Sequence, residues 1–322
     1  MAWADLLGHD LAKHVFQTHL KMGTVPNAYL LAGPDGVGKR RLALEMAKAL
    51  TCTSEGARPC DHCATCTQIA KGLHPDVHLL VPAGASDQIG IEEIRHLLGR
   101  IVLRPFNARC QVAVIDGANR LTEEAANSLL KTLEEPPHHA HFLLVTGQLS
   151  HCLPTIVSRC QLIRCHPLPV EAVRQILTAS RPCEPHVTEM VCRLCSGSAA
   201  KAVELAGRWE HHQQLIARMA TLEVTAWIEE GLPQARQEVM QVLDRMVGWL
   251  RDLAMTACGS PTGVVHRSHE DAMRRQAATV EADQCVEAAF ELIRLRESLE
   301  QFVSPRLVAA LARETWFSLM HR

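Results

Sequence analysis

A glycine-rich segment with a lysine is the first place in this sequence where residue types and spacing could support chemistry. Gly33, Gly36, Gly38 and Lys39 stand in GPDGVGK, which matches G-x-x-x-x-G-K between an apolar segment and a helical pattern. In that context backbone N–H groups close around phosphate oxygens, and the lysine reaches the β- and γ-phosphates. The alternative interpretation is a tight turn before a helix. The pattern predicts a phosphate-binding loop.

Two positions that a hydrolysing site needs hold unsuitable residues. Arg40 follows Lys39, where a Ser or Thr hydroxyl would ligate Mg²⁺, and one cation cannot coordinate another. Asp116 ends an apolar run at the place of a metal-binding carboxylate, but Gly117 stands where AAA+ ATPases usually have a glutamate that polarises water. We predict a site that has lost hydrolysis. The sequence leaves open whether ATP or ADP still binds, because phosphate cradling and Mg²⁺ ligation are partly independent.

Thr146 and Arg159 are further candidates for contact with a nucleotide. Thr146 ends a strand-like run, at the place of a sensor that would hydrogen-bond a γ-phosphate, although a strand-end threonine is usually structural. Arg159 lies between Ser158 and Cys160. Its planar fork suits phosphate and could act in trans on a neighbour's γ-phosphate, whereas the alternative is an ordinary solvated or paired arginine.

Four cysteines within fifteen residues form a second chemical pattern. They have the spacing C-x7-C-x2-C-x2-C at Cys52, Cys60, Cys63 and Cys66. Four thiolates complete a tetrahedral Zn²⁺ site with no open position, so we predict a structural zinc, with unligated thiols as the alternative. His62 and His74 are not needed as ligands and are expected at the surface. The other nine cysteines lack ligand spacing and are expected to act as small buried apolar residues.

The elements around these residues alternate between strands and helices in the first half of the chain. Strand-like runs at 28–31, 77–81, 112–115 and 142–145 are separated by helical patterns. Such alternation predicts a parallel sheet with helices on both faces, over residues 1–165. The strand signal then fades, and we expect a small helical domain at 166–207 and an all-α domain at 208–322.

Composition sets limits on the kind of protein. The chain has 322 residues, a formal net charge of -2 and 47% hydrophobic residues, so it can bury real cores but has no overall electrostatic attraction to nucleic acid. No apolar run is long enough to span a bilayer, and the charged start lacks a signal-peptide core. Thirteen cysteines, an odd number, indicate thiols and metal rather than disulfides. We therefore expect a cytoplasmic protein.

Taken together, four segments resemble the bacterial clamp-loader family of DNA polymerase III, a family of AAA+ proteins. They are GPDGVGK, the four-cysteine insert, VAVIDGANRLTEEAANSLLKTLEEPP and TIVSRC. The resemblance covers about residues 1–207, and beyond that only helical character and length agree. Within the family, γ/τ subunits have an intact ATPase site, whereas δ′ subunits share the zinc module and the Ser-Arg-Cys motif but have a degraded nucleotide site. Arg40 and Gly117 favour the δ′ type, as does Ala200 at the usual sensor 2 arginine position.

The resemblance implies a role within a complex. Arg159 would project into the ATP site of an adjacent γ/τ subunit and stabilise charge there, while this chain hydrolyses nothing itself. Residues 166–207 would be a lid, and residues 208–322 would form a collar that holds a hetero-pentamer with γ/τ and δ subunits. That complex would place a sliding clamp on primer-template DNA. Two alternatives stay open: an ATP-hydrolysing γ/τ-like subunit, and a zinc-dependent DNA-binding module, which the near-neutral charge does not favour.

Overall fold

The protein divides into two compact units in a computed structural model that describes residue 3 and residues 5–83, 87–221, 235–260, 264–266, 269–300 and 303–320. The units are Met1–Glu204 and Leu205–Arg322, and the boundary between them falls inside helix α9 (Ala199–Gly207). The first unit therefore contains nearly all of the residues expected to form two domains, at 1–165 and 166–207. The division of the chain into three domains stays a prediction.

A parallel five-stranded sheet forms the centre of the first unit, in the order β2-β3-β4-β1-β5. Its strands are β1 (Ala28–Ala32), β2 (Val77–Leu80), β3 (Gln111–Asp116), β4 (Ala140–Thr146) and β5 (Gln161–Arg164). The first four confirm the predicted strands. The sequence does not indicate β5, because it is a four-residue edge strand in which Ile163 alone is fully buried.

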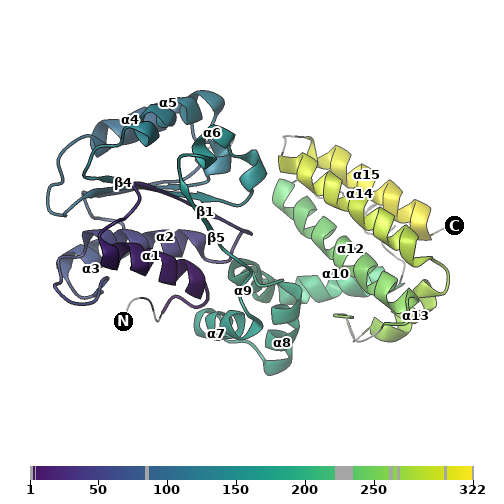
Figure 1. Cartoon of the computed structure of the whole chain (residues 1–322). Helices are drawn as coiled ribbons and strands as arrows, with labels where there is room; N and C mark the ends of the chain where they lie inside the picture. Colours follow the sequence, from purple (N-terminus) through teal and green to yellow (C-terminus); the bar gives the residue numbers. More distant parts are fainter. Residues whose placement is uncertain are drawn as a thin grey trace. The chain divides into compact units, whose positions relative to one another are not determined.

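Helices cover both faces of this sheet, as expected from the alternating pattern (Figure 1). One face carries α1 (Asp10–Met22), α2 (Lys39–Thr51) and α3 (Ala64–Ala70), and the other carries α4 (Ile91–Ile101), α5 (Glu123–Glu134) and α6 (Pro154–Val157). The apolar faces of α4 and α5 pack on the sheet in one core with Leu30, Ile115 and Leu144. The predicted parallel sheet with helices on both faces is confirmed.

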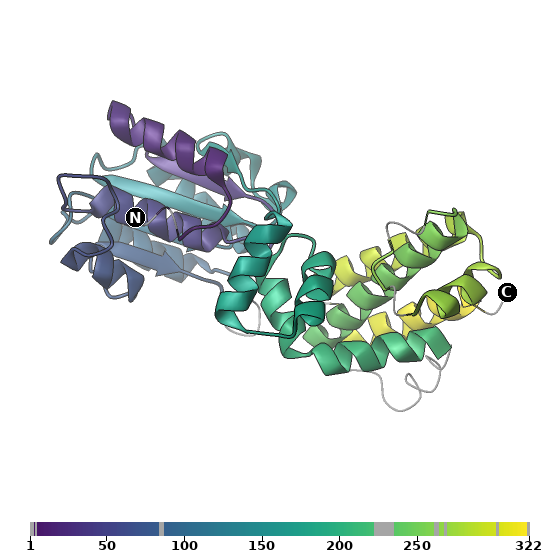
Figure 2. The same ribbon diagram turned by 90° about the horizontal axis from the view of Figure 1, so that it is seen from below.

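Three short helices follow the last strand within the first unit. These are α7 (Val170–Ser180), α8 (Pro185–Leu194) and α9, which form the teal group beyond the sheet in Figure 2. Pro169 precedes α7 and Pro185 begins α8, where the fixed φ of proline suits a helix start. No strand follows β5 in the described ranges, in agreement with the fading strand signal.

The second unit is helical throughout its described elements. It contains α10 (Trp209–Thr221), α12 (Arg236–Ala257), α13 (Glu270–Ala277), α14 (Ala282–Glu300) and α15 (Pro305–Met320). Their apolar faces share a core around Leu243, Trp249, Leu292 and Trp316. The helices expected in this part of the chain are therefore present among the described residues. Among the described helices, none combines the length and the apolar character that a bilayer crossing requires.

Candidate nucleotide cleft and cysteine cluster

The glycine-rich loop joins β1 to α2, as the sequence pattern predicts. Two of its glycines are needed because other segments of the chain pack directly against the loop. A Cβ on Gly33 would lie 2.0 Å from the Cys165 carbonyl oxygen, and a Cβ on Gly36, whose φ is +77°, would lie 2.2 Å from Ser198 Oγ. The loop therefore serves close packing within the chain as well as any ligand.

Lys39 at the start of α2 is turned back onto its own loop. Its Nζ donates hydrogen bonds to the carbonyl oxygens of Gly33 and Pro34, both at 2.7 Å, and lies 3.2 Å from Asp35 Oδ1. The side chain is 6% exposed. Because an ammonium group has three donors, a phosphate would have to replace at least one of these partners.

The loop borders a cleft of about 550 Å³ that Asp116 and Gly117 also line. Arg40 Nε lies 3.8 Å from Asp116 Oδ2, so the residue at the Mg²⁺-ligand position faces the predicted metal-binding carboxylate. Burial raises the pKa of Asp116, and the charges of Arg40 and Lys39 oppose that rise. The guanidinium thus offsets part of the cost of burying this carboxylate.

Gly117 occupies a backbone conformation that disfavours the missing glutamate. Its φ is +112°, and a Cβ there would lie 2.9 Å from Pro82 Cγ. Both the positive φ and the contact with Pro82 would strain any larger residue. The backbone at position 117 therefore disfavours the glutamate that AAA+ ATPases usually have there.

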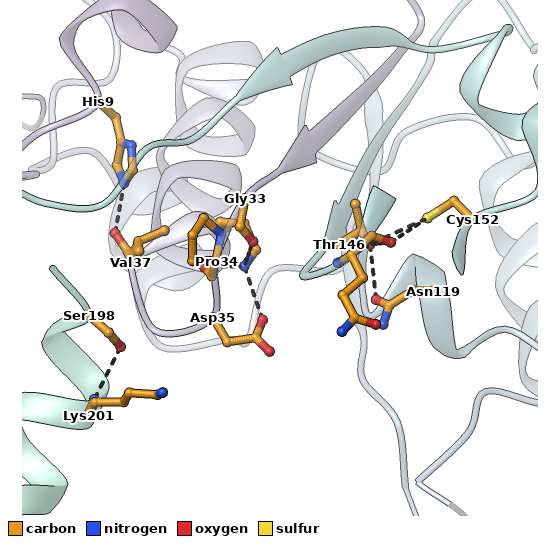
Figure 3. Close-up of polar contacts among 12 residues, drawn as sticks. His9, Gly33, Pro34, Asp35, Val37, Asn119, Thr146, Cys152, Ser198 and Lys201 are labelled. Atoms are coloured by element: carbon orange, nitrogen blue, oxygen red, sulfur yellow. Dashed lines mark hydrogen bonds and ion pairs between the residues drawn. The ribbon is translucent and has the colours of Figure 1, made fainter. Parts of the chain in front are cut away.

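Thr146 ends β4 beside the cleft but is fully buried. Its Oγ1 lies 2.9 Å from the Gln148 carbonyl oxygen and 3.1 Å from Asn119 Oδ1, and Cys152 Sγ donates to it at 3.4 Å (Figure 3). The hydroxyl is thus used within the chain, and its role as a sensor stays a prediction.

Other residues around the cleft are not indicated by the motifs. Arg41, Asn119 and Arg120 line it, and their one sequence signal is closeness along the chain to Lys39 and Asp116. Ala200 also lines the cleft, and its N–H donates to the Gly36 carbonyl oxygen at 3.2 Å. The start of α9 therefore packs against the loop through a small side chain.

Arg159 follows α6 and precedes β5, and it is not among the residues that line the cleft. Its guanidinium donates to the Thr155 carbonyl oxygen at 3.0 Å and to Ser158 Oγ at 3.3 Å, and it forms an ion pair with Glu134 at the end of α5. The side chain remains 34% exposed. The structure therefore presents a partly exposed guanidinium with three acceptors: the Thr155 carbonyl oxygen, Ser158 Oγ and the Glu134 carboxylate.

The four predicted cysteine ligands come together. The sulfur atoms of Cys52, Cys60, Cys63 and Cys66 all lie within 4.8 Å of one another, and the Cys52 and Cys63 sulfurs are 4.0 Å apart. Four sulfurs about 2.3 Å from a tetrahedral ion would be about 3.8 Å apart, so the cluster fits a metal ion after a small contraction.

Backbone groups support the negative charge that metal ligation requires. The N–H groups of Cys63 and Cys66 point at the sulfurs of Cys60 and Cys63, each at 3.4 Å, and Cys63 caps the N-terminus of α3. Burial opposes ionisation of Cys63, but hydrogen bonds from the backbone of Cys66 and Thr53 lower its pKa to about 6. The thiolate, the form that binds metal, is therefore favoured at this position.

The two histidines near the cluster have different surroundings. His62 is exposed, as expected. His74 is 4% exposed, so its prediction as a surface residue is wrong. In the turn after α3 its Nδ1 accepts a hydrogen bond from the backbone N–H of Asp76. The local sequence does not indicate this burial, because histidine occurs both in cores and at surfaces.

The parallel sheet with its glycine-rich loop between β1 and α2 defines a P-loop α/β protein. The sequence model of the family described as DNA polymerase III, delta subunit, matches residues 8–169. The chain belongs to this family. The match confirms the resemblance to the clamp-loader family of DNA polymerase III.

Three relatives show the extent of the similarity. The chain is 37% identical to DNA polymerase III subunit delta' of Bacillus subtilis over 179 residues, which are 56% of this chain and 53% of that protein. It is 38% identical to the delta' subunit of Pseudomonas aeruginosa over 191 residues, 58% of each chain. It is 34% identical to subunit tau of Escherichia coli over 209 residues, 63% of this chain and 32% of that protein. The chain thus spans less than two thirds of the length of these relatives.

Proposed function

We propose that this protein is a non-hydrolysing, δ′-type subunit of the DNA polymerase III clamp loader. In this role it lends Arg159 to the ATP site of a neighbouring γ/τ-type subunit while the complex, which also contains a δ subunit, places a sliding clamp on primer-template DNA. Similarity to proteins named delta' and tau supports the setting. The pairing of Arg40 with Asp116 is the observation that carries the proposal.

The cleft supports the loss of hydrolysis through charge. A Mg²⁺ ion that joins a nucleotide to an ATPase needs a hydroxyl from the loop and a free carboxylate. Here the hydroxyl is missing and the carboxylate of Asp116 faces Arg40 at 3.8 Å. A metal ion would have to displace a guanidinium that carries charge of the same sign. The glycine-rich loop still joins β1 to the N-terminus of α2, so nucleotide binding without turnover is compatible with this site.

The surroundings of Arg159 support a role outside the nucleotide cleft of this chain. The guanidinium is partly exposed, and Glu134, its carboxylate partner among the described residues, is itself half exposed. Exposed ion pairs contribute about 0–1 kcal/mol, so little free energy opposes exchange of Glu134 for the phosphate of a neighbouring subunit. Arginine suits this exchange because its rigid fork binds phosphate in the same geometry as carboxylate.

The cysteine cluster is proposed as a structural zinc site. All four donors are sulfur, which favours zinc among the common divalent ions, and four protein ligands leave no position for a substrate. The ion would hold the loop of residues 52–63 against α3. The cluster has no proposed part in ATP hydrolysis.

Substitution of Arg159 tests the role in trans. In a loader reconstituted from this chain with γ/τ and δ subunits, Arg159→Ala should slow single-turnover ATP hydrolysis at the adjacent site by about 10³-fold or more. Arg159→Lys should recover only part of the rate, because an ammonium cannot bind phosphate in a bidentate manner.

Arg164→Ala is the matched control, since Arg164 is an exposed arginine on the neighbouring strand β5. Its hydrolysis should equal that of the wild type, and size-exclusion chromatography should show intact complexes for every variant. Hydrolysis and clamp placement that are unchanged in Arg159→Ala would refute the role of Arg159.

The γ/τ-like alternative requires this chain to hydrolyse ATP by itself. It would need Mg²⁺ to bind despite Arg40, and some residue other than Gly117 to orient water. Because neither replacement is evident among the described residues that line the cleft, the non-hydrolysing role is preferred.

A further inference from the structure

A second groove, of about 710 Å³, runs along the outer edge of the sheet in the first unit. Strand β2 and the turn that follows α3 form one side, and α4 forms the other. Its apolar lining includes Leu44, Ile69, Val77 and Leu97. Neither the phosphate loop's glycines nor the four cysteines belong to this lining, although Arg40 and Leu44 line both the groove and the cleft.

The edge of β2 offers backbone hydrogen-bonding groups. Within the described part of the chain β2 pairs with β3 alone, and the N–H of Val112 donates to the carbonyl oxygen of Asp76 at 2.9 Å. Because alternate residues of a parallel strand bond to opposite sides, Asp76, His78 and Leu80 face β3, while the N–H and C=O of Leu79 face the open edge. Leu79 is also 39% exposed.

The rim of the groove carries positive charge. Lys71 and Arg100 are exposed and line the groove from opposite sides, and neither forms an ion pair within the described residues. Arg40 lines the groove as well, but it forms an ion pair with Asp116. Glu93 is the one acidic residue of the lining. The charge therefore favours an anionic ligand.

His74 adds a buried hydrogen-bond donor that has no acceptor. Its Nδ1 accepts from the backbone N–H of Asp76 at 3.1 Å, so the ring proton of the neutral form lies on Nε2. Nε2 is buried and has no hydrogen-bond partner among the described residues. An unsatisfied buried donor is unfavourable, and an acceptor on a ligand in the groove would remove that penalty.

We propose that this groove binds an extended, acidic peptide segment of a partner protein, which adds to β2 as a further strand. Leu79 would supply backbone hydrogen bonds, Lys71 and Arg100 would bind acidic side chains, and the apolar lining would take the alternate side chains that point inward. A peptide fits better than nucleic acid, because a strand edge matches a peptide backbone and Leu73 and Leu79 form an apolar lip. This inference does not depend on the proposed function.

A display library of random decapeptides, screened against the full chain, tests the charge requirement. We expect acidic sequences to be enriched, and an enriched peptide to bind Lys71→Glu/Arg100→Glu at least about tenfold more weakly in fluorescence anisotropy. Lys21→Glu/Arg181→Glu makes the same charge change at two exposed residues outside the groove and should bind as the wild type does.

A second pair of variants tests the strand edge. Leu79→Pro removes the outward N–H without removing a bond to β3, and Leu79→Thr shortens the side chain but keeps that N–H. Binding should fall at least about fivefold in Leu79→Pro and stay within about twofold in Leu79→Thr, with equal thermal midpoints for the two proteins.

Several results would overturn the proposal. They are a screen that enriches no peptide or only neutral and basic ones, binding that ignores both the charge reversal and Leu79→Pro, and a 20-nucleotide single strand that binds through Lys71 and Arg100 while no peptide does. None of these readings involves ATP hydrolysis, so they are independent of the test of Arg159.

Discussion

The phosphate-loop cleft and the four-cysteine cluster lie in the same unit, but their charged groups are arranged differently. In the cleft the groups that would bind a nucleotide and its metal already have partners: Lys39 bonds to loop carbonyl oxygens and Arg40 faces Asp116. In the cluster four sulfurs, all of them possible metal ligands, lie within 4.8 Å of one another. The cleft is internally balanced, whereas the cluster has a ligand set that calls for a metal ion.

This difference shows that a sequence motif can be kept for packing after its chemical activity is lost. The loop keeps its glycines because Cys165 and Ser198 pack where side chains would be, a requirement that holds with or without nucleotide. The cysteines gain nothing comparable from each other, since converging thiolates repel without a cation. A preserved glycine pattern is therefore compatible with lost hydrolysis, while preserved cysteine spacing argues for a bound ion.

Loss of one sulfur ligand should have the largest effect on stability. Cys66→Ser should abolish binding of one zinc equivalent and lower the stability of the first unit by several kcal/mol, because the metal's binding free energy is part of the folding free energy. Metal analysis of the purified protein and thermal unfolding check both effects. Cys258→Ser, at an exposed cysteine of the other unit, should change neither. Full stability without metal in Cys66→Ser would remove the contrast between the two sites.

Two aspartates of the first unit should respond differently to substitution. Asp76 is 1% exposed and accepts hydrogen bonds from the N–H groups of Phe106, Asn107 and Ala108 at 2.7–2.8 Å. Asp76→Asn should cost about 3 kcal/mol, because an amide turns a donor toward those N–H groups. Asp116→Asn in the cleft should change stability by less than about 1 kcal/mol, since its partner Arg40 is 51% exposed.

The pH dependence sharpens the same difference. Burial opposes ionisation of Asp76, but the three N–H groups outweigh burial and lower its pKa below 3.8. Its contribution to the free energy of unfolding is therefore fully present above that pH and is lost as the pH falls through the lowered pKa. Asp116 has a raised pKa, so its ionised form costs folding free energy. Protonation on acidification removes that cost, whereas protonation of Asp76 removes a stabilising interaction. Urea unfolding from pH 3 to pH 7 should show the gap between wild type and Asp76→Asn narrowing toward pH 3. A stability advantage of the wild type over Asp116→Asn at pH 7 that is lost toward pH 3 would reverse these assignments.

Gly117 should resist substitution more than a glycine with a similar backbone in open space. Gly117→Ala should cost about 2–3 kcal/mol, from its φ of +112° together with the contact at Pro82. Gly72→Ala, at φ +70° with nothing within 4 Å of the added Cβ, should cost about 1 kcal/mol. Chemical denaturation of both variants gives the comparison. Equal losses would mean that Pro82 does not restrict this position.

Local sequence patterns predict the elements of this fold better than the contacts between them. The loop at 33–39, the four cysteines and the first four strands are indicated because each depends on spacing within a short segment. The short edge strand β5 has too few buried residues to give a signal, and the turn that buries His74 depends on packing against β2.

The ion pairs of Arg40 and Arg159 also cannot be predicted from spacing along the chain. Arg40 meets Asp116, and Arg159 meets Glu134, across 76 and 25 positions that only the folded sheet brings together. The sequence indicates that Arg40 cannot ligate Mg²⁺. The structure adds that the charge of Arg40 lies beside Asp116, the carboxylate predicted to ligate Mg²⁺.

Turnover of ATP by the isolated protein is the most direct test of the central claim, that this cleft cannot hydrolyse nucleotide. Purified protein, with and without Mg²⁺, is assayed for phosphate release beside an active γ/τ-type subunit under the same conditions. We expect no Mg²⁺-dependent release above the rate without protein, whether or not nucleotide binds. Release at a rate comparable to that of the γ/τ-type subunit would contradict the claim.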